Sequence, residues 1–314
     1  MSMSTIGGAD MQRRVEGEIF KQGRDLRGTS FRSLIFGALA LSIMILIVLL
    51  IDVFLDGWPL LSERFGDFWN GTLRSRSVDP KLGIAQGLRG SFWIAVMVAV
   101  LSFPVGISAA IYLEEYAPQN WVTNAIDIAI RNLAGVPSVV YGLLGLFLFV
   151  KIANNSQSYL AAGGFTLAIL VLPIVVITSA EAIRAVPSSL RQGAYGVGAT
   201  QWDVIRTQVL PYAAPGILTG TLLSLSRAVG EAAPLILVGA ITDRLGLTSF
   251  FDPGQLGDKF TAMPIVIVGW VQDSGIDAGF ATAAGAAIVV LLALVIAMNS
   301  VAVTLRNYFE KKRG

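Results

Sequence analysis

Residues 34–51 form a run of 18 positions without a single charge. A run of this kind indicates whether a chain folds in water or in a lipid bilayer. An α-helix of about 20 apolar residues crosses the roughly 30 Å hydrocarbon layer of a bilayer. Because a helix satisfies its backbone hydrogen bonds internally, a chain with several such stretches is expected to be an all-α, polytopic membrane protein. The sequence predicts six transmembrane helices, over residues 34–55, 92–113, 133–152, 165–180, 214–241 and 280–305.

The composition points the same way and excludes most enzyme classes. Hydrophobic residues make up 54% of the chain and charged residues 14%, whereas soluble domains carry about 25% charged residues. The 314 residues include no cysteine and no histidine. This excludes disulfides, thiol and imidazole catalysis, and zinc sites of the usual ligand type, so we expect neither an enzyme nor a metal site. The net charge of +2, with dispersed basic residues, does not indicate nucleic-acid binding.

The distribution of Lys and Arg predicts the orientation. The tails and the loops on their side of the membrane hold fourteen of these residues, against eight on the opposite side. The positive-inside rule therefore places both termini in the cytoplasm. The first apolar run follows a polar tail of 33 residues and is too long for a cleaved signal peptide, so we expect it to remain as a membrane anchor.

The polar segment between the fourth and fifth apolar stretches has the pattern of a helical hairpin. Ser189 with Gln192, and Thr200 with Asp203, have the spacing of capping boxes, and Gly198 lies between them. Two short helices separated by a glycine turn are therefore predicted.

The second of these helices is predicted to be amphipathic. Trp202, Ile205 and Val209 recur at helical spacing and give it one apolar face. Such a face could press against a partner protein, and the alternative is an ordinary loop at the membrane interface.

The order of small residues in this segment resembles the cytoplasmic EAA loop of ABC-importer permeases, where the permease meets its ATPase. The matching residues are Gln192-Gly193-Ala194, then Gly198, then Leu210-Pro211. The family's opening glutamate is glutamine here, which keeps the capping geometry but removes a charge available for docking. The residues predicted to couple to an ATPase are Ser189, Gln192, Gly193, Ala194, Gly198, Thr200, Trp202, Leu210 and Pro211.

Further motifs narrow the resemblance to one family. The runs 134–143 (AGVPSVVYGL), 185–188 (AVPS) and 226–235 (SRAVGEAAPL), and Met263-Pro264 with Trp270, are similar to the A-type permease subunit of phosphate-specific ABC transporters. The resemblance extends over residues 87–306, and the Arg-x-x-Gly-Glu-x-x-Pro-Leu run is its most specific part.

This resemblance implies a type I ABC importer in a bacterial cytoplasmic membrane. Its expected partners are a C-type second permease subunit, two ATPase subunits, an extracytoplasmic phosphate-binding protein and membrane lipid. ATP and Mg would be bound by the ATPase, and no cofactor by this chain, because none of its six lysines precedes Ser or Thr as a P-loop requires. The implied organisation is a cytoplasmic tail (1–33), a first transmembrane helix (34–55), an outer loop (56–91), a permease core (92–305) with its coupling loop (181–213, motif 189–211), and a C-terminal tail (306–314).

Arg227 and Glu231 are the candidate substrate-pathway residues, together with Tyr141. An arginine within a membrane span costs about 2.5–3.5 kcal/mol on insertion scales, so the two charges should face the bundle interior or a watery cavity. Arg227 could hold a tetrahedral oxyanion with its planar fork, and Glu231 could accept the proton that hydrogenphosphate carries and sulfate lacks. A structural ion pair is the alternative. For Tyr141 we consider an aromatic gate or a lipid-facing ring.

Other functions remain open at this point. A sulfate or molybdate importer would share the loop motif, and a membrane scaffold, a sensor or a channel is compatible with the composition, although no selectivity filter is recognisable. Gly216 and Gly220 have the small-x-x-x-small spacing of close helix packing, so we expect a helix contact there and not a site.

Overall fold

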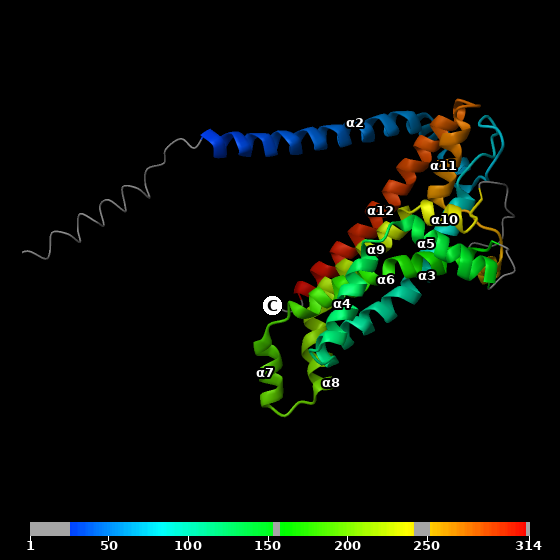
Figure 1. Cartoon of the computed structure of the whole chain (residues 1–314). Helices are drawn as coiled ribbons and strands as arrows, with labels where there is room; N and C mark the ends of the chain where they lie inside the picture. The colour runs from blue at the N-terminus through cyan, green and yellow to red at the C-terminus, as the bar shows by residue number, and fades with distance from the viewer. Residues whose placement is uncertain (1–25, 153–157, 242–251, 312–314) are drawn as a thin grey trace, which may run out of the picture. The chain divides into compact units, whose positions relative to one another are not determined.

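The computed structural model describes residues 26–152, 158–241 and 252–311, and it is almost entirely helical (Figure 1). The chain divides into two compact units, Met1–Asp52 and Val53–Gly314. The first unit contributes the beginning of helix α2 (Leu26–Asn70), whose side chains from 30 to 52 are exposed. This apolar surface suits a lipid environment, in agreement with the predicted membrane anchor.

Five of the described helical stretches are long and apolar enough to cross a membrane, and a bent pair of helices supplies a sixth span when counted as one. The single stretches are Ser30–Asn70 in α2, Ala85–Tyr116 (α3 with the π-helix η1), Leu160–Arg184 (α6), Gln201–Gly230 (α8, η3 and α9) and Gly279–Tyr308 in α12 (Gly279–Lys311). The predicted all-α, six-span membrane protein is therefore confirmed.

The third span differs from the predicted helix 133–152. Helix α4 already begins at Trp121 and ends at Ala134, and helix α5 (Ser138–Gly145) with the π-helix η2 (Leu146–Ile152) continues after a bend of 97°. Pro137 lies at the bend and caps α5 with an extended ψ of 138°. Proline fixes its own φ and disfavours helix in the residue before it, so the chain turns at 135–137. A hydropathy window averages over such a turn.

The fifth span is also interrupted. Helix α9 (Leu210–Gly230) ends one residue before Glu231, which has an extended backbone (φ −81°, ψ 116°). A separate short helix, α10 (Ala233–Leu237), follows with Pro234 in its first turn. The predicted continuous helix 214–241 is therefore wrong after Gly230, because the Pro234 ring removes an amide donor and starts a new helix.

Most of the predicted outer loop 56–91 is ordered. Its first part extends α2 to Asn70, and α3 (Ala85–Ile111) begins within its last part. Between them, Thr72 and Leu82 form an isolated parallel bridge, and Leu73 and Leu82 are buried in the same apolar cluster as Trp270 of α11 (Met263–Asp273). Burial of these leucines explains why the segment folds onto the helices beside it.

The membrane core is built from α3, α6, α9 and α12, with α3 packed on α6, α6 on α9 and α9 on α12. A Cβ added at Gly216 would lie 2.8 Å from the Cβ of Ala182, and one added at Gly220 would lie 2.5 Å from the Cβ of Thr178. The predicted close helix contact at Gly216 and Gly220 is thus confirmed, and α6 is its partner.

Candidate functional site

The predicted helical hairpin is present between α6 and α9. Helix α7 (Ser188–Gly196) forms its first arm, and α8 (Gln201–Val204) with the π-helix η3 (Ile205–Val209) forms the second. Figure 1 shows α7 and α8 projecting from the end of the second unit that lies opposite α11. Gly198 has a φ of +87° and joins the two arms. Val197 is the C-cap of α7, so Gly198 occupies the position where a helix is commonly closed by a left-handed residue.

Of the two predicted capping boxes, only the second exists. The Thr200 hydroxyl accepts from the Asp203 amide, and the Asp203 carboxylate accepts from the Thr200 amide. The first box, between Ser189 and Gln192, is wrong. Pro187 is the N-cap residue of α7, so Ser189 already lies inside the helix and cannot cap it.

The predicted apolar face of the second arm is split. Ile205 and Val209 are fully buried, whereas Trp202 is 52% exposed. The π-helical turn that begins at Ile205 widens the helix and moves Val209 out of register with Trp202. Trp202 instead joins Tyr195 and Val197 as an exposed apolar side chain of the hairpin. The hairpin therefore has a buried base and an apolar surface available to a partner protein.

The remaining motif residues lie along the same hairpin. Gln192 and Gly193 are exposed on α7, and Ala194 and Leu210 pack against the buried cluster at the base of the hairpin. Pro211 is the second residue of α9 and directly follows the π-helical turn η3, within one helical stretch from Gln201 to Gly230. These positions agree with a surface element whose root is fixed in the protein.

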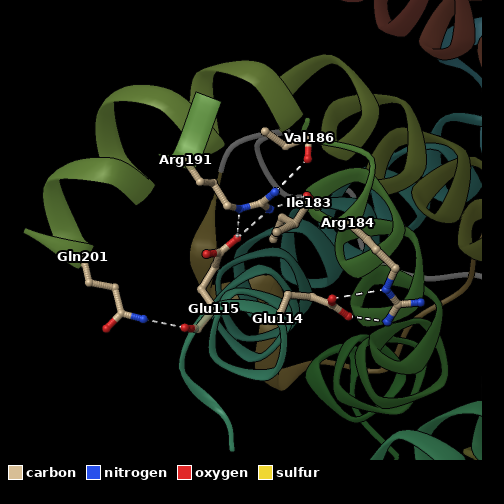
Figure 2. A network of polar contacts seen from close by, with 7 residues as sticks. All are labelled: Glu114, Glu115, Ile183, Arg184, Val186, Arg191 and Gln201. Atoms are coloured by element: carbon tan, nitrogen blue, oxygen red, sulfur yellow. Dashed lines mark hydrogen bonds and ion pairs between the residues drawn. The ribbon is translucent and has the colours of Figure 1, made fainter. Parts of the chain in front are cut away.

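A polar network that we did not predict holds this root in place (Figure 2). Arg191 of α7 donates from Nη2 to Glu115 Oε1 over 2.8 Å, and Gln201 of α8 donates to the Glu115 carbonyl oxygen. Beside them, Arg184 at the end of α6 pairs with Glu114. Both glutamates belong to η1 (Tyr112–Tyr116), which continues α3. Two adjacent acidic residues directly after an apolar span were the available sequence clue, but their partners are about 70 positions away.

The candidate pathway residues Arg227 and Glu231 do meet in the structure. The Arg227 Nε and Glu231 Oε1 atoms are 3.4 Å apart, across the end of α9. The Arg227 side chain is 57% exposed and that of Glu231 20% exposed. Arg227 therefore does not point into this chain's own helix bundle. Its donors are accessible from outside the chain, as they would be beside a polar cavity or a second subunit.

Of the two alternatives considered for Tyr141, the lipid-facing ring is wrong for this chain, and the aromatic gate stays a prediction. Its ring is 7% exposed, so it is not lipid-facing in this chain, and its hydroxyl donates to the Leu133 carbonyl oxygen over 2.9 Å. This bond connects α5 to the last turn of α4 and braces the 97° bend between them. The Leu133 carbonyl oxygen also accepts from the Val136 amide (3.0 Å), so the hydroxyl adds a second bond to it.

Metal chemistry has no support in the described ranges, where His, Cys, Asp and Glu form no group of three that could hold an ion.

Comparisons with known proteins agree with this geometry. The probable ABC transporter permease protein YqgH of Bacillus subtilis (strain 168) is 37% identical over 193 residues, which are 60% of this chain and 61% of that protein. The phosphate transport system permease protein PstA 1 of Mycobacterium tuberculosis (strain ATCC 25618 / H37Rv) is 29% identical over 293 residues, 92% of this chain and 91% of that protein. The phosphate transport system permease protein PstC of Haemophilus influenzae is 29% identical over 256 residues, 74% of this chain and 78% of that protein.

Two solved structures share the fold. The inward-facing MetNI methionine ABC transporter aligns with a TM-score of 0.56 at 18% identity, over 72% of this chain and 95% of that one. A bacterial alginate ABC transporter, in complex with its alginate pentasaccharide-bound periplasmic protein, aligns with a TM-score of 0.60 at 14% identity, over 89% and 96%. A family model matches residues 102–313, about two thirds of the chain. The chain belongs to the family of binding-protein-dependent transport system inner membrane components.

Proposed function

We propose that this chain is the A-type permease subunit of an ATP-driven importer of inorganic phosphate and forms half of the translocation path. This proposal rests mainly on the geometry of the hairpin. Its base is buried through Ile205 and Val209, and Gly198 forms its turn. The side chains of Tyr195, Val197 and Trp202 are exposed. Large apolar side chains exposed on an element that projects from the helix bundle favour coverage by a second protein. The substrate is inferred from relatives that are phosphate transport system permeases.

The hairpin surface would dock on an ATPase in the cytoplasm. Two such ATPase subunits, a C-type second permease subunit and an extracytoplasmic phosphate-binding protein complete the proposed importer. Relatives of both the PstA and the PstC type, and the periplasmic protein in the alginate transporter structure, support this set of partners. Docking in the cytoplasm also supports placing both termini there, in a bacterial cytoplasmic membrane, as the distribution of Lys and Arg predicts.

ATP and Mg would be bound by the ATPase subunits and not by this chain. A phosphate-cradling loop needs a lysine followed by Ser or Thr, and none of the six lysines meets that requirement. The chain is therefore proposed to be a non-catalytic subunit that receives energy through its hairpin.

Arg227 and Glu231 are proposed to face the path between the two permease subunits. The exposed guanidinium of Arg227 offers a planar set of donors that suits a tetrahedral oxyanion. Glu231 lies beside it on an extended backbone segment and would accept the proton of hydrogenphosphate. Tyr141 would act on the path indirectly, by bracing the bend between α4 and α5.

The test is reconstitution of the complete importer in vesicles. We expect phosphate uptake that needs both internal ATP and the external binding protein. A tenfold excess of sulfate or molybdate should compete little with phosphate. A preference for phosphate of about 1.4 kcal/mol would offset a tenfold excess of the other anion. The chain purified alone should bind no nucleotide. Uptake without ATP, or equal competition by sulfate, would contradict the proposal.

A further inference from the structure

Glu115 is a carboxylate that the structure encloses at the junction of the membrane helices and the hairpin. Its side chain is only 7% exposed, and its Oε1 atom accepts from Arg191 Nη2 (2.8 Å) and Nε (3.2 Å). A charge removed from water to this extent needs an ionised, hydrogen-bonded partner, so the pair is strongly constrained in its geometry. The two partners come from different elements, since Glu115 lies in η1 and Arg191 lies in α7.

Arg191 also binds the end of a second membrane helix. Its Nη1 atom donates to the Val186 carbonyl (2.7 Å), and Nη2 donates to the Ile183 carbonyl (3.0 Å). Ile183 lies in the last turn of α6, and its carbonyl oxygen also accepts from the Val186 amide just beyond the helix (3.2 Å). A planar guanidinium can serve a carboxylate and two carbonyls at once, which a lysine ammonium on a flexible stem does less well.

The second arm of the hairpin is attached at the same residue. Gln201, the first residue of α8, donates from Nε2 to the Glu115 carbonyl oxygen. Both arms therefore meet Glu115, one at its side chain and one at its backbone, as Figure 2 shows. π-helical turns, which are frequent at functional sites, lie at Glu115 in η1 and directly after α8 in η3.

The neighbouring residue Glu114 provides an internal contrast. It belongs to the same π-helical turn and also pairs with an arginine, Arg184, whose side chain is 56% exposed. Arg184 is the last residue of α6, so this pair joins two membrane helices and involves neither arm of the hairpin. Glu114 and Glu115 thus both pair with an arginine, but only Glu115 is connected to the hairpin.

We propose that Glu115, Arg191 and Gln201 form a latch that transmits displacement of the hairpin to α3 and α6. This inference rests on the proposed function, in which an ATPase moves the hairpin. The buried base formed by Val204, Ile205 and Val209 is apolar, and such contacts have no preferred direction. The hydrogen-bonded ion pair is directional, so it fixes the angle at which the hairpin meets the membrane helices. The three residues are positioning residues and touch neither nucleotide nor phosphate.

The test compares Glu115→Gln, Arg191→Lys and Gln201→Ala with the matched control Glu114→Gln in the complete, reconstituted importer. We expect the three latch variants to assemble and to keep hydrolysing ATP. The phosphate imported per ATP hydrolysed should fall about tenfold in Glu115→Gln, which loses the charge-assisted contact. A similar fall is expected in Arg191→Lys, which keeps the charge but loses the planar fork that serves the carboxylate and two carbonyls at once. The fall should be smaller in Gln201→Ala. In Glu114→Gln this ratio should remain within about twofold of the parent. The Glu114 side chain is 16% exposed, but its partner Arg184 is largely in solvent and neither residue belongs to an arm of the hairpin.

A second measurement is independent of transport. Hydrogen exchange of the amides in α7 and α8 should become faster in Glu115→Gln and stay unchanged in Glu114→Gln, because only the former frees the hairpin. An unchanged import-to-hydrolysis ratio in Glu115→Gln and Arg191→Lys would overturn the latch. Failure of Glu115→Gln to assemble would overturn it as well, since the pair would then be a folding element. Absence of ATP-driven uptake in the unsubstituted importer would instead refute the proposed function, and the exchange measurement would still report on the latch.

Discussion

Arg227 shows how a single residue can keep its charge in an apolar helix. The side chain leaves the bundle, remains 57% exposed, and pairs with Glu231 at a distance of 3.4 Å, where α9 has already ended. An ion pair that is exposed to this degree contributes at most about 1 kcal/mol to stability. Its presence is therefore better explained by the proposed contact with the transported anion than by folding.

We predict that Arg227→Gln assembles normally but imports phosphate at least about tenfold more slowly, because one charge-assisted contact to the anion is lost. The double variant Arg227→Gln with Glu231→Gln should show the same loss. Uptake into vesicles, normalised to the amount of assembled importer, measures the effect.

The control for this prediction is Arg131→Gln. Arg131 pairs with Asp127 at the same i,i+4 spacing, and both side chains are 41% exposed. This variant should import at the parental rate. Parental uptake by the well-assembled double variant would mean that the pair at 227 and 231 is only structural.

At the scale of the elements, those parts of the hairpin were predictable whose geometry depends on local sequence alone. Gly198 indicated a turn, and the turn is there with a φ of +87°. Ser189 was assigned as a cap although Pro187 stands two residues earlier and starts the helix first. The network around Glu115 was not predictable, because Arg191 and Gln201 reach it only after α3 and α6 have packed together.

The two interrupted spans were missed for a related reason. Hydropathy indicates whether a segment lies in lipid or in water, but not the course of its backbone. A hydropathy average over about 20 residues therefore does not detect the bend at 135–137 or the break at Glu231. In both places a proline, Pro137 or Pro234, was the local indication. Proline also occurs inside an uninterrupted helix here, as Pro173 does in α6. Its effect depends on whether neighbouring groups satisfy the freed carbonyl, which the sequence does not state.

Gly198→Val should disable the hairpin without affecting membrane insertion. A Cβ at this position would meet no other atom within 4 Å, so the cost comes from the backbone conformation and not from crowding. A left-handed residue other than glycine costs about 1–2 kcal/mol, and a β-branched side chain belongs to the worst cases. We expect loss of ATPase docking or of substrate-stimulated ATP hydrolysis in the reconstituted importer.

Gly196→Ala is the matched control for this change. Gly196 is the last residue of α7 and also has no atom within 4 Å of an added Cβ, but its φ is not positive. Alanine is the better helix former, so this variant should keep its stimulated hydrolysis. Unchanged stimulated hydrolysis in Gly198→Val would show that the turn does not need its left-handed glycine.

A second element-level prediction concerns the turn between α11 and α12. The Asp277 carboxylate accepts from the hydroxyl (2.7 Å) and the amide (2.9 Å) of Ser77, and these bonds hold the pKa of Asp277 below its ordinary value of 3.8. A carboxyl whose pKa is lowered by folding stabilises the folded state above its ordinary pKa. That contribution is lost as the pH falls through the lowered value.

Asp277→Asn should therefore lower the melting temperature at neutral pH by about 2 °C or more. Asparagine has one carbonyl oxygen, so its NH₂ group would face one of the two Ser77 donors. The difference from the parent should shrink as the pH falls below 3.8. Thermal unfolding of the detergent-solubilised chain measures this, with Asp273→Asn as the control. A difference that persists in acid would exclude the charge of Asp277 as its cause.

At the scale of the whole molecule, the two ends of the second unit lie too far apart to share one side of a bilayer. The helix from Ala85 to Tyr116 has 32 residues, which corresponds to about 48 Å of helix. One end of this helix adjoins the loop that contains Ser77, whose hydroxyl donates a hydrogen bond to Asp277. The other end contacts the hairpin through Glu115. A hydrocarbon layer is only about 30 Å thick, so the two ends should lie in different compartments.

The absence of cysteine makes this orientation directly testable. Val197 on the hairpin is 86% exposed, and Val78 and Ile276 at the other end are 80% and 93% exposed. Each would be replaced singly by cysteine and treated with a membrane-impermeant thiol reagent. With the hairpin in the cytoplasm, Val78→Cys and Ile276→Cys should react in right-side-out vesicles, whereas Val197→Cys should react only after permeabilisation. The Val78 and Ile276 variants must be labelled from the same side of the membrane, because the neighbouring residues Ser77 and Asp277 are hydrogen-bonded to each other. Labelling of Val197→Cys from outside would reverse the proposed orientation and exclude docking of a cytoplasmic ATPase on the hairpin.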